Sequence, residues 1–148
     1  MKKERSLREQ AVAYLAQREH SRAELARRLA RHARHPDEIP PLLDELVRRK
    51  LLSDDRYAEA RATALGRKFG PARIAWELRA KGVDEAAIAQ AMHTARTTEL
   101  DRARQAWGKR FDGPPRSAVE RAKQIRFLQR RGFSFDAIRR VVSGADGA

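Results

Sequence analysis

The stretch LLSDDRYAEARATALGRKFGPARIAWELRAKG, which runs from Leu51 to Gly82, decides the fold. It predicts two helices with a tight corner between them. Ser53 can cap the first helix, and the two aspartates after it lie where the helix dipole favours negative charge. Gly70 ends that helix and Pro71 begins the next, because glycine tolerates the left-handed conformation after a helix and proline has no N–H to leave unpaired at the first helical position. Gly82 ends the second helix.

The sequence on either side of this stretch repeats its pattern. Amphipathic helices alone could match at a few positions by chance, because all of them share the 3.6-residue period. Here the helix breaks match as well, which counts against chance. A shift of 49 residues pairs Ser21 with Gly70, Leu25 with Ile74, Leu29 with Leu78, Ile39 with Ile88, Leu42 with Ala91 and Leu43 with Met92. A further shift of 50 pairs Leu78 with Leu128, Gly82 with Gly132, Val83 with Phe133, Ile88 with Ile138 and Met92 with Val142.

The repeat predicts an all-α protein built from three tandem three-helix repeats, at residues 1–52, 53–96 and 97–148. Three short helices bury little surface by themselves, so each unit must pack against its neighbour, as in a solenoid. We therefore expect an elongated, curved solenoid. The tail after Ser143 has nothing to bury, and we expect it to be frayed.

Local patterns predict where several helices begin and end. Capping boxes, in which a serine and a glutamate three residues later satisfy each other's backbone N–H groups, are expected at Ser6, Ser21 and Ser117. The helix after Ser21 should reach about Ala33. In the next helix the pattern of large apolar residues predicts one inward face, with two prolines in the first turn, where they are least harmful. That face consists of Ile39, Leu42, Leu43, Leu46 and Val47.

Composition limits the class of protein. The chain has 148 residues, of which 36% are charged, and its mean hydropathy is -0.75. It contains no cysteine, so neither a disulfide framework nor a thiolate zinc site is possible. The N-terminus lacks the apolar run of a signal peptide, and no stretch approaches the ~20 apolar residues of a membrane span. We expect a cytoplasmic protein that neither enters nor binds a membrane.

Positive charge dominates the sequence. The formal net charge is +13, with +5 in residues 1–52, +2 in 53–96 and +6 in 97–148. Such a field favours nucleic acid or an acidic protein surface as the partner. The alternative is a solvated, salt-bridged helical surface without a partner, since acidic residues are plentiful too. Because the two ends carry most of the charge, well-separated contacts with one partner are expected to reinforce each other.

A catalytic or metal-binding interpretation finds little support. None of the nucleotide-binding, serine-hydrolase or zinc-protease motifs occurs. His32 and His35 could face one way, but two ligands without a third make a poor metal site. Asp54 and Asp55 are adjacent on a helix and point about 100° apart, so they indicate first-turn caps, and Tyr57 indicates core. We expect no enzymatic activity, no cofactor and no metal.

The second helix of each unit carries the candidate binding residues. If the apolar residues of these helices face inward, nine others face outward, and the repeat shifts make Arg27, Trp76 and Arg126 equivalent. The sequence thus predicts one strip along the solenoid, with basic ends and an aromatic centre. This basic strip consists of Arg27, Arg31, Arg34, Arg73, Trp76, Arg79, Lys123, Arg126 and Arg130. It could follow a phosphate backbone with Trp76 stacking on a base, or lie in an acidic protein groove with Trp76 as anchor. Otherwise Trp76 packs against a neighbouring unit and the arginines only solvate the surface.

The chain also resembles a known family from Leu7 to Val142. The residues that carry the resemblance are Leu52, Asp54, Asp55, Arg56, Tyr57, Ala58, Gly70, Ile74, Leu78, Lys81, Gly82, Arg126, Phe127, Leu128, Arg131, Gly132, Phe133 and Ile138. In order and spacing they resemble the RecX family of bacterial recombination regulators. The resemblance implies three tandem three-helix repeats that bind the RecA recombinase and its filament on single-stranded DNA. It also implies inhibition, in most cases, of strand exchange, ATP hydrolysis and co-protease activity, and hence a part in DNA repair and the SOS response.

Two functions therefore remain open on the sequence. The first is a RecA regulator without catalysis of its own, for which we expect a monomer. The second is a helical DNA-binding module that acts without RecA through its basic surface. The second predicts tight binding to DNA alone at physiological salt. If six strip residues neutralised phosphates, the log–log salt slope for single strands would be about -4.

Overall fold

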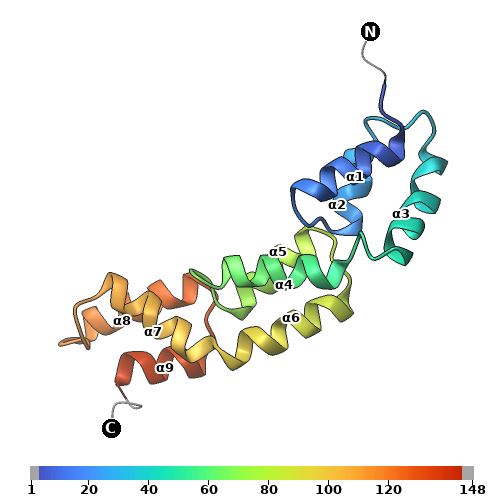
Figure 1. Cartoon of the computed structure of the whole chain (residues 1–148). Helices are drawn as coiled ribbons and strands as arrows, with labels where there is room; N and C mark the ends of the chain where they lie inside the picture. The colour runs from blue at the N-terminus through green and yellow to red at the C-terminus, as the bar shows by residue number, and fades with distance from the viewer. Residues whose placement is uncertain (1–3, 145–148) are drawn as a thin grey trace.

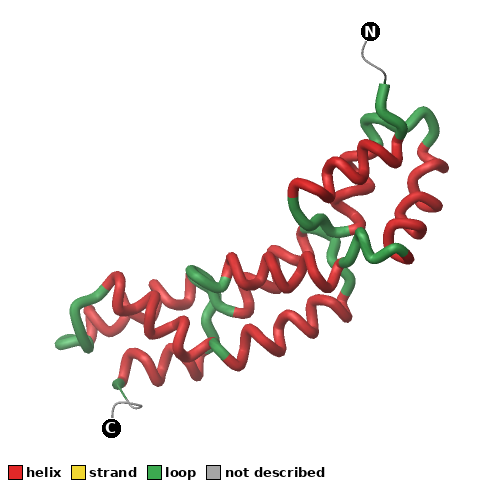
Figure 2. Tube along the Cα trace, in the orientation of Figure 1, coloured by secondary structure: helices red, strands yellow, loops and turns green. Residues whose placement is uncertain are grey.

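The computed structural model describes residues 4–144, and these form an elongated, bent stack of helices (Figure 1). Within that range all regular structure is helical, as the tube in Figure 2 shows, and it contains no strand. The N-terminal and C-terminal units lie at opposite ends of the stack, with the middle unit between them. The prediction of an all-α, three-unit, curved solenoid is confirmed. The predicted frayed tail lies largely outside the described residues.

Each unit contains three α-helices. The first contains α1 (Leu7–Gln17), α2 (Arg22–Leu29), a short 3-10 helix η1 (Pro36–Glu38) and α3 (Ile39–Arg48). The second contains α4 (Asp54–Leu65), α5 (Pro71–Ala80) and α6 (Glu85–Thr97). The third contains α7 (Glu99–Arg110), α8 (Ala118–Arg130) and α9 (Phe135–Ser143).

Three small hydrophobic cores, one for each unit, stabilise the stack. Nearly all the apolar residues that the repeat shifts pair are buried, and the equivalent Leu29, Leu78 and Leu128 are each 0% exposed. The predicted inward face of α3 is only partly right. Leu42 is half-buried, and Val47 is 44% exposed because it lies at the edge of the apolar stripe.

One of the three predicted capping boxes is complete. At the start of α1, Ser6 and Glu9 each accept the other's backbone N–H. At the start of α2, Ser21 accepts the N–H of Glu24 at 3.0 Å, but the Glu24 carboxylate binds the Arg18 guanidinium at 2.8 Å instead of the backbone. The α8 box is also half formed, because its glutamate accepts a different backbone N–H. The serine caps were therefore predicted correctly, whereas two glutamate partners were not.

The first unit departs from the repeat after α2. This helix ends at Leu29, four residues before the predicted end at Ala33. Residues 30–33 continue as hydrogen-bonded turns, and His35 is extended, with φ -138°, because it precedes Pro36. The connection to α3 is therefore longer than the corresponding turns before α6 and α9.

The joint between the first and second units is formed by the start of α2 and the turn after α5. The Ser21 hydroxyl donates to the Lys81 carbonyl at 2.8 Å. Gly82 is left-handed, with φ +72°, and a Cβ on it would lie 2.5 Å from the Cβ of Ala23. Glycine is needed here both for its backbone conformation and for the close approach of the two units.

The joint between the second and third units repeats this arrangement. The Gly70 N–H donates to the Arg131 carbonyl at 2.6 Å, and the Ala72 N–H to the Gly132 carbonyl at 3.2 Å. Under the repeat shifts Gly70 is equivalent to Ser21, and Arg131 to Lys81. In both joints the start of one unit's second helix therefore packs on the turn after the next unit's second helix, which explains why the helix breaks recur with the repeat.

Candidate basic surface

All nine residues of the predicted basic strip are exposed. Trp76 is 61% exposed, so the alternative in which it packs against a neighbouring unit is wrong. An exposed tryptophan gains little from folding and is available for contact with a partner.

The sequence predicted that all nine strip residues are helical, but two of them are not. Arg27 lies on α2, but Arg31 and Arg34 follow its end because the helix is shorter than expected. The middle three residues lie on α5 and the last three on α8. The structure brings Arg73 and Trp76 together, with the guanidinium carbon 5.1 Å from the ring centroid. That the three groups form one continuous face stays a prediction.

Ion pairing differs along the strip. In the middle unit, Arg73 pairs with Glu77 at 3.2 Å and Arg79 pairs with Glu85 at 3.0 Å. The hydrogen bond from Arg79 lowers the pKa of the Glu85 carboxyl. The six strip cations of the two end units make no ion pair with any residue in 4–144. Within the strip, the cations without an ion pair therefore lie in the two end units.

Arginines and aromatic rings alternate across the second joint. On the middle unit, the Arg73 guanidinium lies between two rings, 5.1 Å from the centroid of Trp76 and 5.3 Å from that of Phe69. The next guanidinium belongs to Arg131 of the third unit, 6.0 Å from Phe69 and 4.7 Å from Phe127. Cation–π contacts therefore cross from one unit to the next.

The same series continues within the third unit. The Phe127 and Phe111 rings meet edge to face at 5.4 Å, and the Arg110 guanidinium lies 5.1 Å from the Phe111 centroid. We call the whole series the Arg–aromatic ladder, and its members are Trp76, Arg73, Phe69, Arg131, Phe127, Phe111 and Arg110. Sequence reasoning found only its first two members as candidates. The local sequence does not single out the rest, since all five of the chain's phenylalanines stand within four residues of a ladder arginine and only three of them belong to the ladder.

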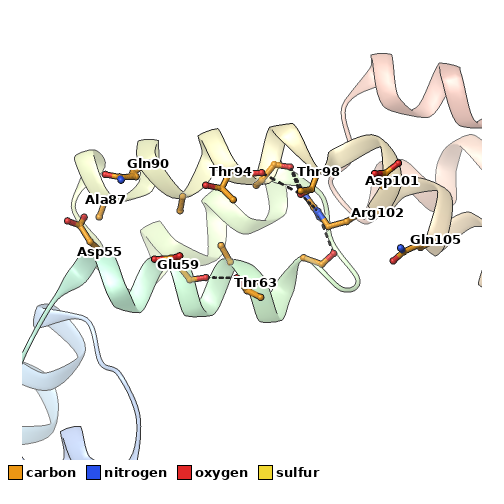
Figure 3. A pocket seen from close by; sticks show the side chains of 14 residues that line it. Asp55, Glu59, Thr63, Ala87, Gln90, Thr94, Thr98, Asp101, Arg102 and Gln105 are labelled. Carbon is orange, nitrogen blue, oxygen red and sulfur yellow. Dashed lines mark hydrogen bonds between the residues drawn. The ribbon is translucent and has the colours of Figure 1, made fainter. Parts of the chain in front are cut away.

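One cavity is lined by residues of α4, α6 and α7 and by none of the strip residues (Figure 3). It encloses about 510 Å³. Arg102 projects from α7 and donates to the backbone carbonyls of Gly66, Phe69 and Ala95 at 3.1, 2.6 and 2.6 Å. Burial lowers the pKa of this guanidinium. Arg102 thus connects the C-terminal ends of α4 and α6 in the middle unit to the third unit, which is a structural role.

The polar residues considered for chemistry have structural roles. The Asp54 carboxylate accepts the backbone N–H of Arg22 at 2.8 Å and that of Asp84 at 3.3 Å. Tyr57 is 5% exposed, as predicted, and burial raises the pKa of its phenol. His32 and His35 are exposed, and within residues 4–144 no group of three side chains could bind a metal ion. In the same range no helix is long and apolar enough to cross a membrane.

Comparison with known proteins gives consistent matches along the chain. Models described as the first, second and third three-helix domains of RecX match residues 8–46, 53–92 and 97–142. The Regulatory protein RecX of Leptothrix cholodnii is 48% identical over 141 residues, covering 95% of this chain and 90% of that protein. That of Chromobacterium violaceum is 44% identical over 140 residues, covering 95% and 91%. The crystal structure of RecX from Lactobacillus salivarius superimposes with a TM-score of 0.83 at 22% identity, covering 96% of both chains.

Proposed function

Because this chain belongs to the RecX family of regulatory proteins, we propose that it binds the RecA recombinase and its filament on single-stranded DNA. Bound there, it modulates, and mostly inhibits, strand exchange, ATP hydrolysis and co-protease activity. It acts by occupying the filament and catalyses no reaction of its own. The identity of the partner comes from the family, while the contact residues are argued from this chain.

The observation that carries the binding mode is the set of unpaired cations at both ends of a long, bent stack. Arg27 in the first unit and Arg126 in the third are exposed, and neither has an acidic partner within residues 4–144. Two charged contacts on one molecule raise each other's effective concentration, so a weak contact at each end gives firm binding overall. A filament offers such repeated sites at a fixed spacing.

The test measures RecA ATP hydrolysis on single-stranded DNA while the protein is titrated in. We expect hydrolysis to fall, and the double variant Arg126→Glu/Arg130→Glu to inhibit much less. The matched control is Arg139→Glu/Arg140→Glu, which changes the same charge in the same unit at two exposed arginines that both pair with Asp136. RecA activity that is unaffected by the wild-type protein would disprove the regulatory proposal, and equal inhibition by both variants would disprove the strip.

The exposed cations also support a second function, a DNA-binding module that acts without RecA. It predicts tight binding to DNA alone at physiological salt, with a log–log salt slope of about -4 if six strip residues contact phosphates. Weak binding to DNA alone together with strong inhibition of RecA would favour the first function.

We propose the remaining properties on the same basis. Regulation of RecA requires a cytoplasmic protein with a part in recombinational repair and the SOS response, and it requires neither cofactor nor metal. We also propose a monomer whose units are bounded at residue 52/53, in the connection between α3 and α4, and at 96/97, in the last turn of α6.

A further inference from the structure

We propose that the Arg–aromatic ladder at the second joint is a binding site for single-stranded DNA, in which bases stack on its rings and guanidinium planes. The proposal deepens the proposed function, because the strand would be that of the RecA filament. It is nevertheless tested without RecA, so the two proposals can fail separately.

The rings of the ladder are more exposed than ordinary core residues. Trp76 is 61% exposed, and the three phenylalanines are only half-buried. The hydrophobic cores of the second and third units close over other residues, and the ladder rings lie at their margins. Phe69 packs in part against the core of the second unit and Phe127 against that of the third, and each of the four ladder rings also contacts a guanidinium.

The ladder is not an ordinary salt-bridge network either. Of its three arginines, only Arg73 has an acidic partner within residues 4–144. Arg131 donates to the Lys68 carbonyl at 3.2 Å and stacks on rings, and among the described residues Arg110 contacts only the Phe111 ring. A guanidinium that stacks on a ring keeps N–H groups along its edge free for phosphate oxygens.

The dimensions and chemistry fit an unpaired strand. Successive members of the ladder are in contact, with centres 4.7 to 6.0 Å apart, so bases would stack on the faces that the members leave exposed, above all on the 61% exposed Trp76. Proteins that bind single strands without sequence preference combine such stacking platforms with positive charge that follows the backbone. A duplex hides the faces of its bases and could use only the charges. The ladder therefore selects single strands over duplex.

Fixed geometry favours the same conclusion. The ladder crosses the joint where the Gly70 N–H donates to the Arg131 carbonyl, so its middle members are positioned by backbone contacts between the units. Binding then costs little side-chain entropy, because Arg73 and Arg131 are already ordered by the rings on either side of them.

The experiment measures fluorescence anisotropy of a labelled short oligothymidine as the full chain is added, at several salt concentrations. We expect Trp76→Ala to weaken binding by about 5- to 150-fold, the range measured for the loss of one base–aromatic stack. We expect Arg73→Lys/Arg131→Lys to weaken it by about fivefold or more, because lysine retains the charge and loses the planar stack. Since the charge is retained, the salt slope of this double variant should equal that of the wild type.

The control is Arg139→Lys/Arg140→Lys, two exposed arginines on α9 that pair with Asp136 and stack on no ring of residues 4–144, and it should bind as the wild type does. Thermal unfolding followed by circular dichroism checks that every variant is folded. Wild-type affinity in both ladder variants, or equal affinity of the wild type for duplex and single strand, would overturn the proposal. Ladder variants that bind oligothymidine normally but fail to inhibit RecA would assign the ladder to a protein partner instead.

Discussion

The second joint can be opened by adding one methyl group. A Cβ on Gly70 would lie 2.5 Å from the Gly132 carbonyl oxygen and from the Cα and N of Phe133. All three are backbone atoms, so no side chain can rotate away. Gly70 has φ -88° and ψ 177°, a conformation that alanine adopts freely. The variant Gly70→Ala therefore tests the contact between the units without adding backbone strain.

The expected cost follows from two terms. Inserting one methyl into a close-packed contact costs about 1–3 kcal/mol. Separating the helix start from the turn also removes the bonds to the Arg131 and Gly132 carbonyls, each with a net value of about 0.5–1.5 kcal/mol. The sum is about 2–6 kcal/mol, a large part of the stability of a typical domain. We expect the joint to open before either core unfolds, since each unit has its own core.

The assay is denaturant unfolding with Trp107 fluorescence as the probe for the third unit, in a Trp76→Phe background. Circular dichroism reports on all helices together. Gly70→Ala should split the transition in two and increase the radius of gyration in X-ray scattering. The control is Gly108→Ala, where no atom of the described residues lies within 4 Å of the added Cβ and where alanine should stabilise α7 by about 0.5–1 kcal/mol. A Gly70→Ala protein with one transition and the wild-type radius would refute the account of the joint.

Three further predictions concern stability. Glu99→Ala should lower the free energy of unfolding by about 2–4 kcal/mol, because the buried Glu99 carboxylate accepts the N–H and the hydroxyl of Ser134 at 2.8 and 2.7 Å. The control Asp101→Ala, at an exposed site, should change it by less than about 0.5 kcal/mol. Arg102→Met should cost about 2–4 kcal/mol in thermal unfolding because three backbone carbonyls lose their donor, and the exposed control Arg96→Met should cost far less. Burial lowers the pKa of His20 below its usual 6.5, so the unfolded chain takes up the proton at a higher pH than the folded chain does. The contribution of His20 to the free energy of unfolding is therefore complete above pH 6.5 and falls as the pH drops, by at most about 1.4 kcal/mol per pH unit. Urea titrations at several pH values should find this slope reduced in His20→Gln.

Short-range signals account for what the sequence predicted well. The helix starts at Ser6, Ser53 and Ser134 and the breaks at Gly82 and Gly132 depend on residues within one turn, so they could be read directly from the sequence. The repeat then extended these local signals to the whole chain. Agreement between local pattern and global packing is typical of a sequence that specifies one fold.

The failures involve contacts between residues far apart in the chain. Glu24 has the spacing of a capping box but binds Arg18, because the turn after α1 brings that guanidinium within 2.8 Å. The ladder was missed because Phe69 and Arg131 belong to different units and meet only across the second joint. Arg102 is one of 33 lysines and arginines, and nothing in its local sequence distinguishes an arginine that binds three carbonyls from one that is solvated.

The two joints have the same polarity along the chain. In each, the start of one unit's second helix packs on a left-handed glycine in the turn of the following unit. In the first unit, Ala33 occupies the position that Gly82 has in the second, and η1 lengthens the connection there. That end of the molecule consequently has no receptor for the joint contact. The packing scheme of the two joints therefore stops at the first unit, and a further unit placed before it would need a different contact.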